Sequence, residues 1–235
     1  MFMTDEPRRQ KMFPIALAVR ILVVIAIMVG VLPFAIQASP QGKPPTGSRA
    51  NYIRSLESPS RKEWQKPNWI VKRLKLKSGQ RVADIGSGSG YFAIRFARAV
   101  KEAGKVYVVD VDPDMRNYVM WRANKEGLEN LEAVEATFNN PRLGASSVDM
   151  IFMCNTIHHI ENRDRYYPRI TRALKKGGRL VIVDFYERPL PVPSPPPEMK
   201  ISRRDMIEEI EQAGFHLVEE YDFLPHQYFL VFELR

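Results

Sequence analysis

Short apolar runs alternate with amphipathic stretches along the chain from about Asn51 onward. Several of the apolar runs are rich in β-branched residues, and they predict strands at 81–85, 105–110, 131–135, 148–154 and 179–184. Apolar residues at helical spacing between them predict helices at 66–74, 91–102, 115–126 and 164–174. Because strands alternate with helices, the sheet should be mostly parallel and covered on both faces.

The last part of the chain departs from this alternation. A helix predicted at 202–213 and stopped by Gly214 precedes two strands, at 216–223 and 227–233, with no helix between them. The short connection at 224–226 predicts an antiparallel hairpin. The whole pattern predicts an α/β fold of three layers, with a mostly parallel seven-stranded sheet that ends in this hairpin.

A strongly apolar segment at 13–36 precedes the domain, and its one charged residue is Arg20. Two interpretations stay open. The segment is either a signal peptide cleaved near Ala38 or a retained transmembrane anchor in which Arg20 reaches the interface. The residues that follow are rich in proline and glycine at first. We therefore divide the chain into a signal peptide or anchor at 1–38, a linker at 39–60 and one domain at 61–235.

The charges around the apolar segment predict on which side of a membrane the domain lies. Arg8, Arg9 and Lys11 precede the segment, which favours a cytoplasmic N-terminus and a membrane-associated or exported, periplasmic domain. An anchor of the opposite orientation would keep Lys43, Arg49 and the domain in the cytoplasm. Both localisations remain open.

Composition narrows the classes of partner and site. The 235 residues carry a formal net charge of +8, but the basic residues are scattered along the chain. We therefore do not expect nucleic acid as a partner, and an anionic membrane surface explains the excess equally well. Cys154 is the only cysteine, which excludes an internal disulfide and a multi-cysteine zinc site. No metal site is predicted.

The segment between the first strand and its helix reads Asp-Ile-Gly-Ser-Gly-Ser-Gly-Tyr from Asp84 to Tyr91. Glycines there allow a sharp turn and let a ligand approach the backbone closely. Twenty residues after Gly90 the second strand ends at Asp110, whose carboxylate can accept hydrogen bonds from both hydroxyls of a ribose. The pattern indicates a cofactor that contains adenosine.

Two residues distinguish between cofactors of this kind. A dinucleotide site prefers glycine or alanine where this chain has the bulky Tyr91. Asp84, at the tip of the strand, would repel a pyrophosphate but suits a cofactor that carries an ammonium and a sulfonium group. A phosphate-binding P-loop is excluded because no Gly-Lys-Ser/Thr sequence follows the glycines.

With these features the chain resembles the class I, Rossmann-like S-adenosylmethionine-dependent methyltransferases. Five segments resemble the family's motifs in order: 82–90, 108–112, 135–137, 148–159 and 174–180. The resemblance implies S-adenosylmethionine as cofactor, held by Asp84, Gly86, Ser87, Gly88, Gly90, Tyr91, Asp110, Val111, Asp112, Met115, Glu135, Ala136, Thr137 and Asn155. Two assignments carry alternatives. Glu135 is longer than the family's usual aspartate, and Asp112 is also suited to cap the helix that opens with Pro113.

Methyl transfer needs in-line alignment and, for an acidic acceptor, a group that takes up a proton. His158 and His159 follow the fourth strand, and one of them should face the site; we favour His158 as the catalytic residue, although both could serve only local hydrogen bonds. Trp64, Asp184 and Tyr186 are candidates for substrate contact, with packing or capping as the alternative. Cys154 is expected to be a packed strand residue.

A proline-rich stretch at 188–198 follows the fifth strand. It cannot be a helix or a central strand, and we interpret it as a semi-rigid flap over the site, with a simple spacer as the alternative.

The sequence as a whole indicates a methyltransferase that acts on a small-molecule or lipid-like acceptor. The membrane is a further expected partner through 13–36. The alternatives are a NAD-dependent oxidoreductase, against which Asp84 and Tyr91 argue, and a non-catalytic cofactor-binding protein of the same fold. The methyl acceptor and the oligomeric state cannot be predicted.

Overall fold

The computed structural model describes residues 46–235. The apolar segment at 13–36 and the first residues of the expected linker lie outside them. Within 46–235, no helix combines the length and apolar character needed to cross a membrane.

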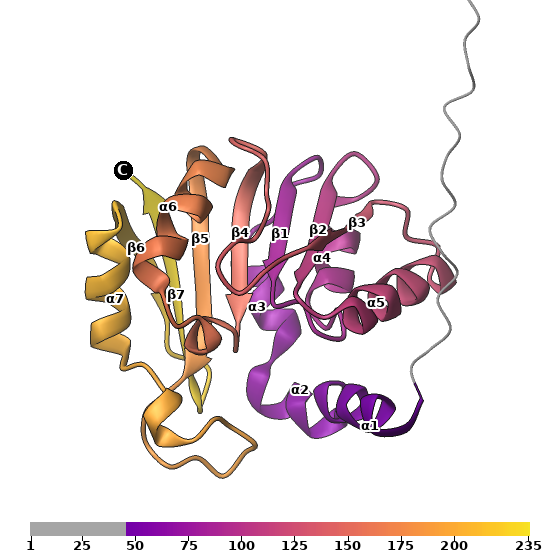
Figure 1. Cartoon of the computed structure of the whole chain (residues 1–235), viewed down its shortest axis with the longest axis horizontal. Coiled ribbons are helices and arrows are strands. Elements are labelled where there is room, and N and C mark those ends of the chain that lie inside the picture. The colour runs from indigo at the N-terminus through magenta and orange to yellow at the C-terminus, as the bar shows by residue number, and fades with distance from the viewer. Residues whose placement is uncertain (1–45) are drawn as a thin grey trace, which may run out of the picture. The chain divides into compact units, whose positions relative to one another are not determined.

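A single seven-stranded sheet forms the centre of the domain (Figure 1). Its strands are β1 (Arg81–Ile85), β2 (Lys105–Asp110), β3 (Leu131–Glu135), β4 (Val148–Cys154), β5 (Leu174–Phe185), β6 (Phe215–Tyr221) and β7 (Gln227–Leu234). They lie in the order β3-β2-β1-β4-β5-β7-β6, parallel from β3 to β5 and antiparallel at β7 and β6. This arrangement confirms the predicted mostly parallel sheet with a C-terminal antiparallel hairpin.

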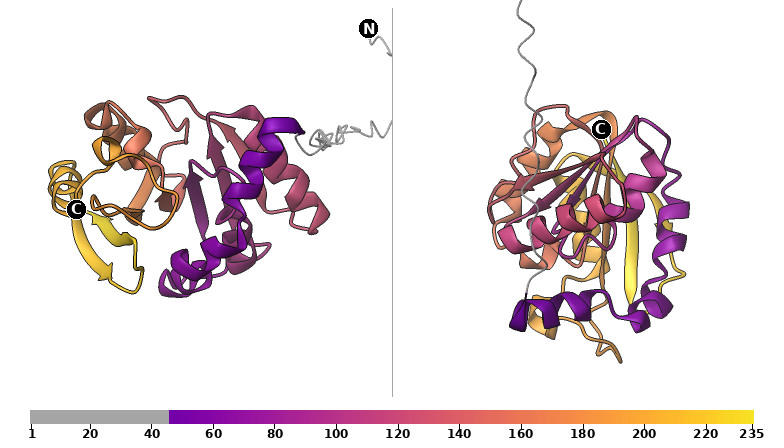
Figure 2. Two further views of the ribbon diagram at one scale, coloured as in Figure 1. Left: turned by 90° about the horizontal axis from the view of Figure 1, so that it is seen from below. Right: turned by 90° about the vertical axis from the view of Figure 1, so that its right-hand side faces the viewer.

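Helices cover both faces of the sheet, as Figure 2 shows. They are α3 (Pro67–Arg73), α4 (Ala93–Val100), α5 (Pro113–Lys125), α6 (Arg163–Ala173) and α7 (Arg203–Gln212). One buried cluster joins the sheet to α3, α4 and α5, and a second joins it to α6 and α7. The neighbours Val82 and Ala83 belong to different clusters, because successive side chains of a strand point to opposite faces. Burial on both faces explains why the strands read as continuous apolar runs.

Strand β5 begins five residues earlier than the sequence predicts, at Leu174 instead of Arg179. Leu174 pairs with Val148 and Arg179 with Met150, so the intervening residues bulge out of the ladder. Gly177 has a φ of 71°, a left-handed conformation that glycine adopts without strain. The Lys-Lys-Gly-Gly stretch, which precedes the predicted strand, is therefore a bulge within the observed strand.

Two helices occupy part of the expected linker and the residues after it: α1 (Gly47–Leu56) and α2 (Pro59–Gln65). Helix α1 has a weak apolar pattern, and Ile53 is its one buried residue, which explains why the sequence did not predict it. Gln65, at the end of α2, is fully buried, and its Nε2 donates to Gln227 Oε1 at 3.1 Å. These helices thus pack on the domain.

Candidate active site

A cavity of about 430 Å³ lies at the carboxyl ends of β1, β2 and β4. The chain leaves β1 toward β2 on one side and reaches β4 on the other, the position at which ligands bind to open parallel sheets. Of the expected cofactor residues, those that line the cavity are Asp84, Gly86, Ser87, Gly88, Tyr91, Asp110, Val111, Asp112, Met115, Ala136, Thr137 and Asn155. The structure therefore brings expected residues from four separate sequence segments, 84–91, 110–115, 136–137 and Asn155, to one cavity.

The glycine loop is held tightly against its neighbours. Gly86 has a φ of 72°, and a Cβ added there would lie 2.2 Å from Thr156 Oγ1. A Cβ on Gly90 would lie 2.8 Å from Val119 Cγ1, so this glycine packs the loop on α5 and does not line the cavity. Both positions require glycine for space as well as for conformation. The loop can therefore present backbone directly to a ligand.

Asp84 is a buried carboxylate in the cavity wall, with 3% of its surface exposed. Its Oδ2 has no hydrogen-bond partner among the described residues. Burial raises the pKa of Asp84 to about 7 from an ordinary value of 3.8. A buried carboxylate with one oxygen unpartnered is costly unless a cation binds beside it, so this wall suits a cationic group of a ligand.

Asp110 and Asp112 have different roles. Asp110 Oδ2 accepts from the backbone N–H of Gly88 at 2.8 Å and its Oδ1 from that of Asp112 at 3.0 Å, which fixes a carboxylate with remaining acceptor capacity for ribose hydroxyls. Asp112 caps α5, since its Oδ1 accepts from Asp114 N at 2.9 Å, and it also pairs with Arg49 at 2.8 Å. The capping alternative for Asp112 is thus realised, although the residue also lines the cavity.

Glu135 does not line the cavity. Its side chain is 67% exposed and lies 3.6 Å from Arg142. The following residues, Ala136 and Thr137, do line it, and so does the exposed Phe138, which the sequence analysis did not name. An aromatic residue directly after 135–137, one of the segments that resemble the family's motifs, was the signal available in the sequence.

His159 lines the cavity and His158 does not. The two residues lie in a 3₁₀ turn, η1 (Ile157–His159). His158 Nδ1 is 2.9 Å from both carboxylate oxygens of Asp184, and the two imidazole rings lie 4.2 Å apart. Burial and the nearby His158 lower the pKa of His159. Geometry therefore gives His159 access to a ligand, in place of the favoured His158.

The three candidates for substrate contact lie outside the cavity. Asp184 holds His158, Trp64 packs against Phe185 with ring centres 5.8 Å apart, and Tyr186 packs edge-on against Tyr228. These contacts correspond to the alternative of packing or local bonding.

Cys154 lines the cavity as a buried thiol that accepts from Gln65 Nε2 at 3.0 Å. Burial raises its pKa to about 12. The group stays protonated at neutral pH, which does not suit a nucleophile.

The expected flap at 188–198 is not part of the cavity, since none of its residues lines it. Arg188 Nη2 donates to the carbonyl of Pro225 at 2.9 Å, and Lys200 Nζ donates to the carbonyl of Arg188 at 3.1 Å. These contacts fasten the segment beside the β6–β7 turn. The spacer alternative describes it better.

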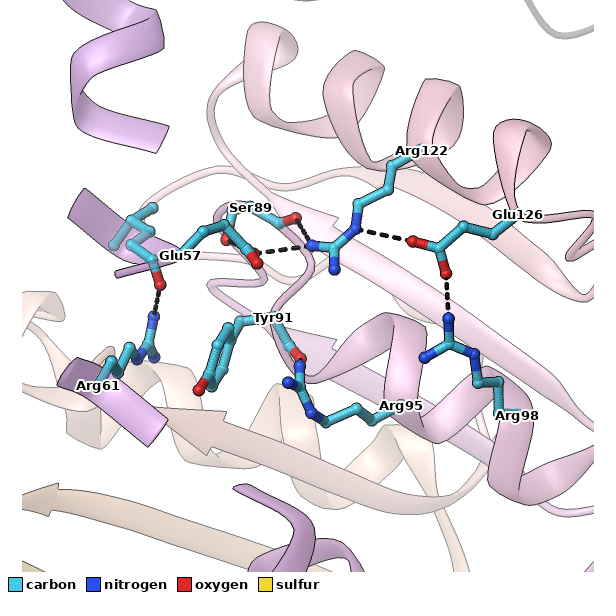
Figure 3. Close-up of polar contacts among 9 residues, drawn as sticks. Glu57, Arg61, Ser89, Tyr91, Arg95, Arg98, Arg122 and Glu126 are labelled. Carbon is cyan, nitrogen blue, oxygen red and sulfur yellow. Dashed lines mark hydrogen bonds and ion pairs between the residues drawn. The ribbon is translucent and has the colours of Figure 1, made fainter. Parts of the chain in front are cut away.

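The cover of the cavity comes instead from α1 and α2, whose Arg49, Tyr52, Leu56 and Arg61 line it. A chain of polar contacts ties this cover to the glycine loop (Figure 3): Glu57 Oε1 accepts from Ser89 Oγ at 2.6 Å and from Arg122 Nη1 at 2.7 Å. Sequence patterns could not reveal this cover, because its residues follow no motif and meet the site only in the folded chain.

Residues 46–235 contain no cluster of histidine, cysteine and acidic side chains that could hold a metal ion. The donor set of the cavity is instead that of an organic cofactor. It has a buried carboxylate for a cation, backbone and Asp110 for a ribose, and an apolar recess at Val111, Met115 and Ala136 for a base. S-Adenosylmethionine contains all three groups.

Comparison with known proteins agrees with this geometry. Residues 76–219 match the family model described as a methyltransferase domain. The crystal structure of a SAM-dependent methyltransferase from Aquifex aeolicus is 29% identical, covers 81% of this chain and 100% of its own, and superposes with a TM-score of 0.74. The [4+2]-cyclase SpnF, 17% identical over 72% of this chain and 80% of its own with a TM-score of 0.62, shares the fold alone.

Among curated proteins, the ubiquinone/menaquinone biosynthesis C-methyltransferase UbiE of Edwardsiella ictaluri is 30% identical over 111 residues. The match spans 47% of this chain and 44% of that protein, so the chain matches less than half the length of this relative. The family match, the fold and the donor set of the cavity agree. This chain is a member of the class I S-adenosylmethionine-dependent methyltransferases, and S-adenosylmethionine is its cofactor.

Proposed function

We propose that this enzyme methylates an acidic carbon or oxygen of a small, apolar ring compound of the phenol or quinol class. The observation that carries the proposal is that His159 lines the same cavity as the cofactor-binding residues and the apolar residues Ile160 and Tyr166. A ring whose proton must be removed fits a neutral imidazole beside an apolar wall. The names of the UbiE relatives, which specify C-methylation in quinone biosynthesis, support the same class of acceptor.

The chain's own residues have three tasks in such a reaction. When bound, S-adenosylmethionine supplies an electrophilic methyl group on its sulfonium. Asp84, Asp110 and the glycine loop hold the cofactor and fix its direction, which provides the alignment that methyl transfer needs. The apolar walls exclude water and orient the ring. His159 would take up the proton that the acceptor loses, so the acceptor gains a methyl group, the imidazole becomes protonated and the sulfonium is left as the thioether of S-adenosylhomocysteine.

A panel of acceptors tests the proposal. The full chain is incubated with methyl-labelled S-adenosylmethionine and either quinols and phenols with apolar tails, fatty acids, or short peptides. We expect label in the quinol or phenol products, with a preference for those that carry an apolar tail. Labelling of fatty acids or peptides only, with binding of S-adenosylhomocysteine intact, would contradict the acceptor class but not the assignment of the cofactor.

We also propose that 13–36 hold the chain at a membrane with the catalytic domain on the cytoplasmic side. The proposal rests on the apolar sequence of this segment, on the cofactor, which is made in the cytoplasm, and on Lys43 and Arg49 after the segment, which this orientation keeps on the cytoplasmic side. A reporter enzyme fused after Arg235 should be active in the cytoplasm, and the fusion should sediment with membranes. Reporter activity on the outer side would show that the domain is exported.

A further inference from the structure

Arg61 is a cation on α2 that faces the cofactor cavity and has no carboxylate partner among residues 46–235. Its Nη1 donates to the carbonyl of Leu56 at 2.8 Å, and its Nε donates to Gln65 Oε1. The centre of the guanidinium lies 4.2 Å from the ring centroid of Tyr91, the residue that ends the glycine loop (Figure 3). Two neutral acceptors and the face of an aromatic ring therefore position the Arg61 guanidinium. None of the three carries a negative charge that would neutralise it.

Asp84 provides the opposite charge in the same cavity. Its pKa is raised chiefly by burial, and the positive charge of Arg61 is among the influences that oppose the rise. The charges of Arg61 and Asp84 therefore interact electrostatically, although the two side chains form no ion pair within 4.0 Å. An unpaired carboxylate and an unpaired guanidinium on one cavity define a site for a zwitterion, such as an α-amino acid.

We infer that Arg61 binds the α-carboxylate of the cofactor's methionine portion, while Asp84 binds its ammonium group. The inference rests on S-adenosylmethionine as cofactor and adds a residue that lies outside the matched family region of 76–219. An acidic group of the acceptor is the other source of a carboxylate. The cofactor is favoured because Arg61 contacts Tyr91 at the end of the glycine loop and shares the cavity with Asp84. Guanidinium is well suited to this role, since its planar fork matches a carboxylate.

The experiment compares two ligands by isothermal titration calorimetry of the full chain. S-Adenosylhomocysteine carries the carboxylate, and its decarboxylated analogue keeps the amine and the adenosine but lacks it. We expect Arg61→Gln to weaken S-adenosylhomocysteine about 10- to 100-fold, the range for a lost hydrogen bond to a charged group. The same change should alter the affinity of the decarboxylated analogue by less than about threefold. Arg61→Lys should retain part of the affinity for S-adenosylhomocysteine.

Arg95→Gln is the matched control. The Arg95 guanidinium also lies 4.2 Å from the Tyr91 ring centroid, and in Figure 3 the ring lies between the two arginines, but Arg95 does not line the cavity. This variant should bind both ligands as the wild type does, which separates the carboxylate contact from support of Tyr91. Equal weakening of both ligands by Arg61→Gln, or unchanged S-adenosylhomocysteine affinity, would overturn the inference. A wild-type chain that fails to bind S-adenosylhomocysteine would instead overturn the cofactor assignment.

Discussion

Replacement of Asp84 by asparagine should stabilise the cofactor-free enzyme above pH 7 and at the same time weaken S-adenosylhomocysteine about 100-fold. The carboxyl is buried, lacks a partner at Oδ2 and has its pKa raised to about 7 by that burial. Ionisation in the folded state is therefore unfavourable without a ligand, by up to about 4 kcal/mol. The amide is neutral at every pH and avoids this cost, but it cannot pair with the cofactor's ammonium group.

The raised pKa of Asp84 determines how its contribution to stability changes with pH. The folded-state pKa of Asp84 lies above its unfolded value of 3.8, so the folded state binds more protons between these values. The contribution of Asp84 to stability therefore falls as pH rises from about 4 to about 7 and then stays low. For the wild type, the affinity for S-adenosylhomocysteine should rise with pH up to about 7, because binding requires the ionised form.

Thermal denaturation from pH 5 to pH 9, with and without S-adenosylhomocysteine, measures both effects. Asp84→Asn should gain stability relative to the wild type as pH increases, and its ligand affinity should lose most of its pH dependence. Asp164→Asn, a change at an exposed position on α6, is the control and should follow the wild type. Lower stability of Asp84→Asn above pH 7 would show that the carboxylate is compensated in the free enzyme.

Replacement of His159 by glutamine should lower kcat about 10²- to 10⁴-fold, the contribution typical of a positioned general base. The affinity for S-adenosylhomocysteine should stay within about threefold of the wild type, since Asp84, Asp110 and the glycine loop remain. Because burial and His158 lower the pKa of His159, the wild-type kcat at saturating S-adenosylmethionine should rise with pH through a pKa below histidine's ordinary 6.5. Steady-state kinetics with the quinol or phenol acceptor, from pH 4.5 to pH 8, measure kcat and its pH dependence, and calorimetry measures the affinity for S-adenosylhomocysteine.

His216→Gln controls for the loss of an imidazole, since this residue lies on β6 and does not line the cavity. Its kinetics should match those of the wild type. A kcat of His159→Gln within threefold of the wild type would remove the proton acceptor from the proposed reaction and leave alignment as the enzyme's contribution.

The elements that the sequence predicted best are the parallel strands. The bounds of β1 to β4 match the prediction, because strands buried on both faces appear as apolar runs with clear ends. The start of β5 did not match. Lys175, Lys176 and two glycines do not have the character of a strand, and β5 begins before them only because Leu174 pairs with Val148 across the bulge. At the start of β5, where the local preference for strand is weak, tertiary contacts determine the structure.

The residues of the site also fall into two groups, those that the sequence predicted and those that only the fold reveals. Asp84, Asp110 and the glycine loop belong to a motif with a physical reason for each position, so the sequence pointed to them. The choice between His158 and His159 depends on the direction of a 3₁₀ turn, which residue types do not specify. Arg61 lies more than twenty residues before the loop on a helix with little apolar character, and only the folded chain brings it to the cavity.

The buried amide contact between Gln65 and Gln227 has a practical consequence for the smallest active form of the enzyme. It joins α2 to β7, so the helix that carries Arg61 is built into the core. A truncated protein that starts at residue 76, where the family match begins, would expose Cys154 and leave the Gln227 side chain without this partner. We therefore expect the active unit to be larger than the segment 76–219 that the family model matches, and shortened forms made for expression should retain every residue from Gly47 onward.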